Sequence, residues 1–214
     1  MIGIYNYTVI VTYCSLIAAS LGMYFASQGS FRAALISLII SGLCDMVDGP
    51  ISRTRKRTET EKKFGIQIDS LCDLVSFGIQ PAAIVYFICA YNCPDNKLIK
   101  IIALVIGIIF ALCAVIRLAY FNVTEEERQA TEGNKLRTGY QGLPVTNSSL
   151  IMPIAYLSNY FLDGVALACV MMFFLAATAF LFVYNFHMFK LHGKKLIPVG
   201  IAGALVVVAL IFCK

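Results

Sequence analysis

Seven apolar runs, most of them close to the length that crosses a lipid bilayer, determine what this chain can fold into. Backbone polar groups inside hydrocarbon must be paired within the protein, so apolar runs of about 20 residues predict membrane-spanning α-helices. The composition agrees, because 59% of the 214 residues are apolar and only 14% are charged. We therefore predict an all-α fold, a polytopic membrane helical bundle of six to seven transmembrane helices with eight as the upper limit. The apolar runs cover residues 7–26, 33–47, 66–90, 98–121, 143–160, 165–186 and 196–212.

The basic residues indicate how this bundle is oriented. Twelve Lys and Arg residues follow the second, fourth and sixth runs, whereas four lie in the segments on the opposite side. Cytoplasmic loops carry the excess of Lys and Arg in membrane proteins. We expect a multi-pass protein of the cell (plasma) membrane, with its N-terminus and the segment between the second and third runs in the cytoplasm. The net charge of +5 suits an anionic lipid surface and predicts no nucleic-acid partner.

Four aspartates lie where the second and third apolar runs meet. Asp45 and Asp48 are three residues apart, and Asp69 and Asp73 are four apart, so each pair lies on one face of a helix. If the two runs form antiparallel helices, the four carboxylates converge and repel one another unless a counter-charge is present. Oxygen ligands without His or Cys favour Mg²⁺, Mn²⁺ or Ca²⁺, and two such ions are common in phosphoryl chemistry. The alternatives are an aspartate–arginine network around Arg53, or charges that merely end two helices.

Two glycines and an arginine accompany the carboxylates. Gly49 follows Asp48 directly, and Gly65 lies one turn before Asp69 on the same helix face. Glycine costs a helix about 1 kcal/mol, so these positions suggest close approach of a ligand, with helix packing as the alternative for Gly49. Arg53 lies one turn beyond Gly49, where its guanidinium could bind a phosphate. A divalent-cation transporter would also carry aspartates inside its membrane helices, but it would place them along a path rather than near one face.

The same residues form a recognisable pattern. Asp45-x-x-Asp48-Gly49-x-x-Ser52-Arg53, then Gly65-x-x-x-Asp69-x-x-x-Asp73, resembles the signature of the CDP-alcohol phosphatidyltransferase family, with a serine at the position of the usual alanine. The segments "DSLCDLVSFGIQPA", "IRLAYFN" and "YQGLPVTNSS" are similar to the branch of the family that uses serine as acceptor. After Gly-Leu-Pro this chain continues with Val-Thr-Asn-Ser instead of a second proline, which leaves other acceptor alcohols open, of the glycerol 3-phosphate or inositol phosphate type.

The resemblance implies an enzyme of phospholipid biosynthesis that transfers a phosphatidyl group from CDP-diacylglycerol to L-serine and releases CMP. It implies one domain over residues 1–214, with the motif core at 45–73 and extra helices at about 165–213, and a homodimer in membrane lipid. It further implies two divalent cations, Mg²⁺ or Mn²⁺, with Ca²⁺ as an alternative at one site. The implied roles are metal binding for Asp45, Asp48, Asp69 and Asp73, general-base catalysis for Asp73, and nucleotide binding for Gly49, Ser52, Arg53 and Gly65.

The acceptor site must be sought elsewhere in the chain. Arg117 is the basic residue inside the fourth apolar run, where it could hold the carboxylate of serine or the donor phosphate. An arginine that extends from a helix end to the membrane surface is the alternative. Asn122, Asn147 and Ser148 are weaker candidates for the same pocket. The polar stretch 122–142 is long enough for a surface helix or a lid over the site.

Overall fold

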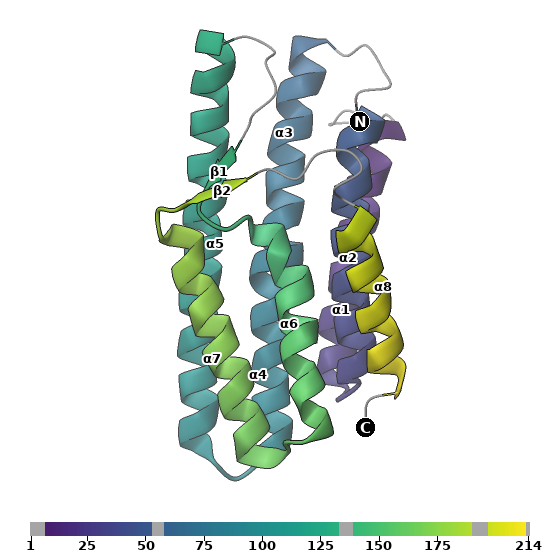
Figure 1. Cartoon of the computed structure of the whole chain (residues 1–214), viewed down its shortest axis with the longest axis vertical. Coiled ribbons are helices and arrows are strands. Elements are labelled where there is room, and N and C mark those ends of the chain that lie inside the picture. The colour runs from purple at the N-terminus through teal and green to yellow at the C-terminus, as the bar shows by residue number, and fades with distance from the viewer. Residues whose placement is uncertain (1–6, 53–57, 133–138, 190–196, 213–214) are drawn as a thin grey trace.

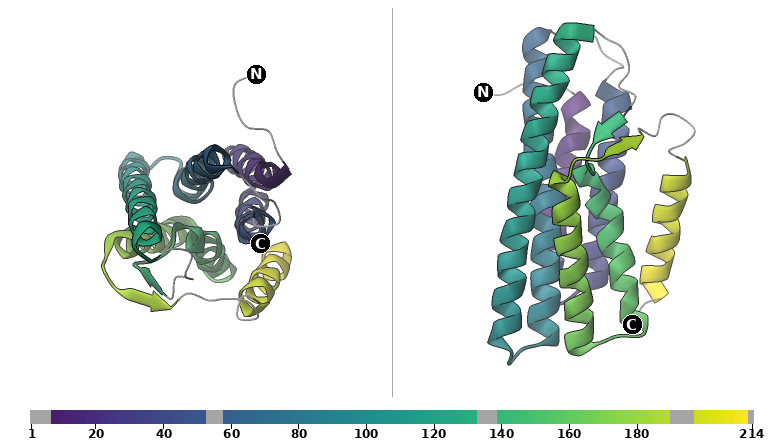
Figure 2. Two further views of the ribbon diagram at one scale, coloured as in Figure 1. Left: turned by 90° about the horizontal axis from the view of Figure 1, so that it is seen from above. Right: turned by 60° about the vertical axis from the view of Figure 1, so that its left-hand side comes forward.

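The chain folds into one elongated helical bundle, as a computed structural model shows (Figure 1). The structure describes residues 7–52, 58–132, 139–189 and 197–212. Its helices run up and down along a common direction, and a short two-stranded ribbon lies against one side of the bundle, in its upper half as seen in Figures 1 and 2. The prediction of an all-α membrane bundle is confirmed, and the ribbon is an addition that the sequence did not indicate.

The first two helices form an antiparallel hairpin. Helix α1 (Tyr7–Ser27) ends at a turn in which Gly29 has a φ of 75°, and α2 (Phe31–Ser52) follows. Within the hairpin, Ser15 Oγ donates to the carbonyl of Ser41 at 3.3 Å, and Ser41 Oγ donates to the carbonyl of Ser15 at 3.1 Å. These reciprocal bonds fix the register of α1 against α2, and so determine which residues of α1 face the aspartates of α2.

The third apolar run is the inner part of a longer continuous helix. Helix α3 (Glu59–Asp73) leads through a π-helical segment, η1 (Leu74–Ile79), into α4 (Gln80–Asn92). The helix starts where Thr58 and Glu61 form a capping box, in which Glu61 N–H donates to Thr58 Oγ1 at 3.2 Å and Thr58 N–H donates to Glu61 Oε2 at 2.8 Å. The helix therefore begins about two turns before the apolar run that starts at residue 66, because its first turns are polar and carry no apolar signal.

Helix α5 (Lys97–Glu132) is the longest element, with 36 residues. At 1.5 Å per residue it measures about 54 Å, well beyond a hydrocarbon core of about 30 Å. It continues past the end of the apolar run at residue 121 and takes in about half of the polar stretch 122–142, for which a surface helix or a lid was expected. An ion pair between Arg128 and Glu125, 2.6 Å apart, stabilises this outer part of the helix.

The last third of the chain is built from shorter pieces. The predicted fifth run consists of a 3₁₀ turn η2 (Val145–Asn147), helix α6 (Ser148–Tyr156) and a second 3₁₀ turn η3 (Leu157–Tyr160). Helix α7 (Gly164–Val183) is regular, and α8 (Ile197–Phe212) lies at the edge of the bundle, where Tyr160 Oη donates to the carbonyl of Ala209 at 2.7 Å. Strands β1 (Gly139–Gln141) and β2 (His187–Phe189) pair antiparallel, with Tyr140 opposite Met188.

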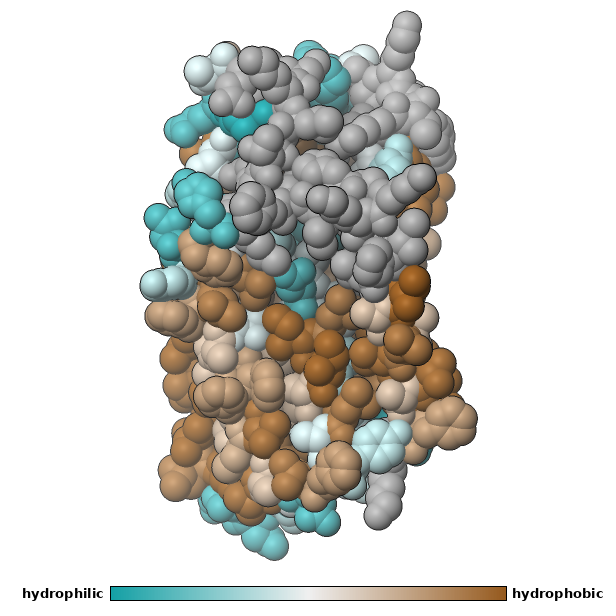
Figure 3. All heavy atoms as spheres, viewed as in Figure 1, coloured by the Kyte–Doolittle hydropathy of each residue, from teal (hydrophilic) through white to brown (hydrophobic). Residues whose placement is uncertain are grey.

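The surface agrees with a multi-pass membrane protein. An apolar belt covers the middle and lower part of the face seen in Figure 3, with hydrophilic side chains at the lower end and on the upper part. Among the described residues, the helices long and apolar enough to cross a membrane are Val9–Ser27, Phe31–Ile51, Glu59–Asn92, Lys97–Arg128 and Gly164–Val183, with Gly200–Phe212 as a shorter apolar helix.

Candidate metal and substrate site

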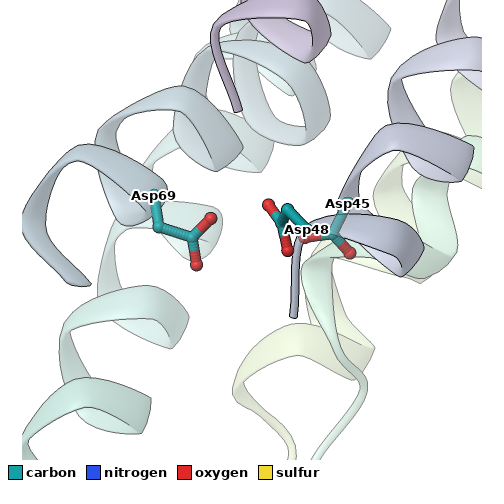
Figure 4. Close-up of side chains that lie close together, drawn as sticks. All are labelled: Asp45, Asp48 and Asp69. Atoms are coloured by element: carbon teal, nitrogen blue, oxygen red, sulfur yellow. The ribbon is translucent and has the colours of Figure 1, made fainter. Parts of the chain in front are cut away.

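Two neighbouring helices bring the motif aspartates together. Asp45 and Asp48 lie in the last two turns of α2, and Asp69 and Asp73 lie in the last two turns of α3. Carboxylate oxygens of Asp45, Asp48 and Asp69 all lie within 4.8 Å of one another. Figure 4 shows Asp69 pointing across from its helix toward the pair on the facing helix. The predicted convergence of these side chains is therefore observed.

Asp73 joins this cluster through a second contact. Its carboxyl group lies within hydrogen-bonding reach of Asp45, while Asp48 and Asp69 lie within reach of each other. Asp73 is also close enough to Asp48 and Asp69 to interact with both electrostatically. This arrangement makes a compact set of four acidic groups rather than two separate helix-end charges.

The cluster has the chemistry of a site for hard cations. Asp48 is only 8% exposed, and the other three aspartates are half-buried. Four carboxylates this close repel one another unless protons or cations intervene. Two ion pairs of the described residues, Lys62–Glu59 and Arg128–Glu125, lie on other parts of α3 and α5 and do not involve these aspartates. A donor set made only of carboxylate oxygens fits Mg²⁺, Mn²⁺ or Ca²⁺, so these residues could hold divalent metal.

Thr12 is a site residue that sequence reasoning missed. It lies in α1, is 6% exposed, and its Oγ1 donates to Oδ2 of Asp48 at 3.5 Å. Gly49 supplies a second contact to the same carboxylate through its backbone N–H. Such partners fix the direction of a metal-binding carboxylate. The available signal was one hydroxyl among several in an apolar run, and nothing singles it out without the register of the α1–α2 hairpin.

The predicted nucleotide-binding residues lie on the α2 and α3 ends of this site. Gly49 is half-buried, and a Cβ placed on it would meet no atom within 4 Å. Packing against the described residues therefore does not explain this glycine, and among those residues the space beside it is open to a ligand. Gly65 is half-buried on α3, one turn before Asp69. Ser52 ends α2, but its side chain and the whole of Arg53 lie outside the described residues.

Of the acceptor candidates, Arg117 and Asn122 lie on α5, Asn147 ends η2 and Ser148 begins α6. Arg117 is 5% exposed, so the alternative of an arginine extended to the membrane surface is wrong. Its Nε–H donates to the carbonyl of Leu143 at 3.1 Å, which joins α5 to the "GLPVTNSS" segment. Asn122 Nδ2 donates to Ser70 Oγ at 2.7 Å, next to Asp69 in the chain. Asn147 is the last residue of η2, directly before α6.

An apolar groove opens between α1 and α2 on the membrane side of the aspartates. Its volume is about 460 Å³. Cys14 lies at one end of this lining, and the groove extends along α1 from Cys14 to Phe25. An apolar chain fits this lining. The residues that line it are Cys14, Ile17, Ala18, Leu21, Phe25, Ala33, Ile36, Ser37 and Ile40.

Comparison with known proteins agrees with the motif and the geometry. The CDP-alcohol phosphatidyltransferase family model matches residues 5–183, and the chain belongs to this family. It is 27% identical over 164 residues to a Helicobacter pylori protein named CDP-diacylglycerol–serine O-phosphatidyltransferase, covering 75% of this chain and 62% of that protein.

Two further relatives extend the comparison. An archaetidylserine synthase of Methanothermobacter thermautotrophicus is 30% identical over 141 residues, covering 66% of this chain and 53% of that protein. A Saccharomyces cerevisiae protein named CDP-diacylglycerol–serine O-phosphatidyltransferase is 35% identical over 120 residues, covering 55% of this chain and 40% of that protein. The chain thus spans 62% or less of the length of these three curated relatives.

Proposed function

We propose that this protein is a CDP-alcohol phosphatidyltransferase that transfers a phosphatidyl group from CDP-diacylglycerol to the hydroxyl of L-serine and releases CMP. The observation that carries the proposal is the convergence of carboxylates from the two halves of the family motif, with oxygens of three of them within 4.8 Å of one another. The names of the relatives support serine as the acceptor.

In the proposed reaction, Asp73 is the general base. A serine hydroxyl is a weak nucleophile at neutral pH, so a carboxylate within hydrogen-bonding reach must accept its proton as the oxygen attacks. The new bond joins the serine oxygen to the phosphorus that carries the diacylglycerol, the bond from that phosphorus to the CMP oxygen breaks, and the proton passes to Asp73. Bound divalent cations would neutralise charge on the phosphoryl oxygens and on CMP.

The other aspartates are proposed to bind metal, and further residues are proposed to bind the two substrates. Asp45, Asp48 and Asp69 are proposed to hold two Mg²⁺ or Mn²⁺ ions together with Asp73, with Ca²⁺ as an alternative at one site. Gly49, Ser52, Arg53 and Gly65 are proposed to contact the nucleotide, and the open space beside Gly49 supports its part in this set. Arg117, Asn122 and Asn147 are proposed to bind the acceptor. The apolar groove between α1 and α2 offers a place for an acyl chain of the donor.

The proposal also covers the domain organisation, the oligomeric state and the membrane location of the protein. We infer a single catalytic domain over residues 1–214, a homodimer in membrane lipid, and a location in the cell (plasma) membrane with the site on the cytoplasmic side. The orientation is supported by Lys62, Lys63 and Arg128, which lie at the bundle end where α3 begins and α5 ends, while Lys97 and Lys100 lie at the opposite end.

The decisive experiment measures CMP release by the purified chain. Protein in detergent micelles is incubated with CDP-diacylglycerol, Mn²⁺ or Mg²⁺, and serine, glycerol 3-phosphate or inositol phosphate in separate reactions. We expect CMP release with serine and its loss in Asp73→Asn. Release with another alcohol alone would replace serine as the acceptor, and no release with any of them would refute the enzymatic proposal.

A further inference from the structure

The helix that carries Asp69 and Asp73 changes its geometry directly after Asp73. The next six residues, Leu74–Ile79, form η1, and the backbone N–H of Gln80 donates to the carbonyl of Val75, five residues earlier. Short π-helical segments inside α-helices are rare and are frequent at functional sites. The orientation of Asp73 therefore depends on what holds η1 in place.

Pro81 accounts for this change. In a regular α-helix the N–H at position 81 would donate to the carbonyl of Phe77, but proline has no N–H and its ring clashes with that carbonyl. The helix widens before the proline, and the Phe77 carbonyl loses its usual α-helical donor. Phe77 is fully buried, and a buried carbonyl without a partner costs free energy.

Ser148 supplies a donor to this carbonyl from a distant part of the chain. Its Oγ lies 3.0 Å from the carbonyl oxygen of Phe77 and 2.9 Å from that of Val145, so its one proton is shared between two acceptors. Ser148 has no exposed surface, and it is the first residue of α6. The "GLPVTNSS" segment is thereby bonded directly to the π-helical segment that follows Asp73.

Two more buried polar contacts hold the same short stretch. Ser76 Oγ lies 3.2 Å from Ser15 Oγ of α1, and Gln80 Nε2 donates to Ser37 Oγ of α2 at 3.0 Å. Ser76 and Gln80 are both fully buried. Three neighbouring helices thus bond to a stretch of five residues, Ser76 to Gln80, that begins three residues after Asp73.

We propose that Ser148 is a positioning residue for Asp73. By holding the Phe77 carbonyl it fixes η1, and through η1 it fixes the direction of the Asp73 carboxylate toward Asp45. The inference rests on the proposed function, because it assigns Ser148 an effect on the metal site and on turnover. Ser76 contributes to the same restraint from α1, and its effect is smaller because the helix keeps its bonds to α2 and α6.

The test compares Ser148→Ala and Ser148→Thr in the full chain, with Thr178→Val as the matched control. Thr178 is 2% exposed and its Oγ1 donates to the carbonyl of Phe174 at 2.7 Å in α7, so the control also removes a buried bond between a hydroxyl and a carbonyl. We measure kcat, the KM for CDP-diacylglycerol, and Mn²⁺ affinity by electron paramagnetic resonance without substrate.

We expect Ser148→Ala to lower both kcat and Mn²⁺ affinity by about 10-fold, as for other residues that orient metal ligands, while the KM changes by less than about twofold. Ser148→Thr should restore most of both losses, and Thr178→Val should leave both quantities near wild type. If Ser148→Ala does not fold, kcat and Mn²⁺ affinity are measured for Ser76→Ala instead, and a loss of both supports the positioning role. Unchanged kcat and Mn²⁺ affinity, or an equal loss in Thr178→Val, would overturn the proposal.

The Mn²⁺ measurement separates this proposal from the proposed function. A wild-type protein that binds Mn²⁺ but releases no CMP would refute the enzymatic function, and the effect of Ser148→Ala on Mn²⁺ affinity would still decide the positioning role. A wild-type protein that releases CMP while Ser148→Ala behaves like wild type would refute the positioning role alone.

Discussion

The hydroxyl of Thr12 donates to the carboxylate of Asp48 at 3.5 Å, so the first helix contacts the acidic cluster although it carries none of the motif. Because Asp48 is almost fully buried, this bond limits the orientations that its carboxylate can adopt. We predict that Thr12→Val lowers Mn²⁺ affinity and turnover by about 10-fold or more, in the range typical of partners of metal ligands. Titration of Mn²⁺ against CMP release measures both.

Ser20→Ala is the control for this prediction. Ser20 is an exposed serine of α1 whose Oγ donates to the carbonyl of Leu16 at 2.9 Å, far along the helix from Asp48. It should keep wild-type Mn²⁺ affinity. If Thr12→Val did the same, the contact with Asp48 would have no part in metal binding.

Metal removal should destabilise the folded protein because of the acidic cluster. Mn²⁺ that binds only the folded state, at 100 times its Kd, stabilises that state by about 2.7 kcal/mol. We predict that Mn²⁺ raises the Tm of the wild-type protein and that a chelator reverses the rise. In Asp69→Asn the rise should shrink or vanish, while the Tm in chelator should match or exceed that of wild type, since one of the four converging charges is gone.

Differential scanning fluorimetry in detergent with Mn²⁺ or with chelator measures these four Tm values. Equal Tm values for the wild-type protein in the two buffers would contradict metal binding at this cluster.

Gly49→Ala separates ligand approach from helix packing. A Cβ at this position meets no atom of the described part of the chain within 4 Å, and alanine favours a helix by about 1 kcal/mol over glycine. We therefore predict an unchanged or higher Tm together with a severalfold higher KM for CDP-diacylglycerol. Gly200→Ala in α8, where a Cβ also meets nothing within 4 Å, should leave the KM unchanged. An unchanged KM in Gly49→Ala would remove this residue from the proposed nucleotide site.

Arg117→Ala tests the acceptor site through selectivity. If the guanidinium holds the carboxylate of serine, its removal should reduce the preference for serine over ethanolamine, which lacks that carboxylate, by about 10-fold or more, since charge-assisted pairs are among the stronger polar contacts. The Tm should also fall, because the Leu143 carbonyl loses its donor. Kinetics with both alcohols measure the ratio, and a fall in Tm with an unchanged ratio would leave Arg117 a structural role alone.

Much of the site could be predicted because it depends on local spacing. Residues three or four apart share a helix face, and a short connection between two apolar runs makes the helices antiparallel, so the convergence of Asp45, Asp48, Asp69 and Asp73 follows from the sequence. Thr12 could not be found in this way, because its contact depends on the register of α1 against α2. That register is fixed by bonds such as Ser41 Oγ to the carbonyl of Ser15.

Helix boundaries were less predictable for a different reason. Apolar character marks only the part of a helix that lies in lipid, so the apolar runs did not include the polar outer turns of α3 and α5. In α5 the residues Thr124–Glu132 are polar but include good helix formers, and the Glu125–Arg128 ion pair supports them. The π-helical segment could not be foreseen, because Pro81 explains it only together with the donor from Ser148, 71 residues from Phe77.

The acidic cluster lies near the end of α2, where the apolar part of the bundle gives way to the polar outer turns of α3. For the proposed reaction this location has a consequence for the products. Phosphatidylserine is insoluble in water and stays in the leaflet where it forms, whereas CMP is soluble and diffuses away on the aqueous side. A reaction centre at the boundary releases each product into its own phase, so neither has to cross the hydrocarbon to leave.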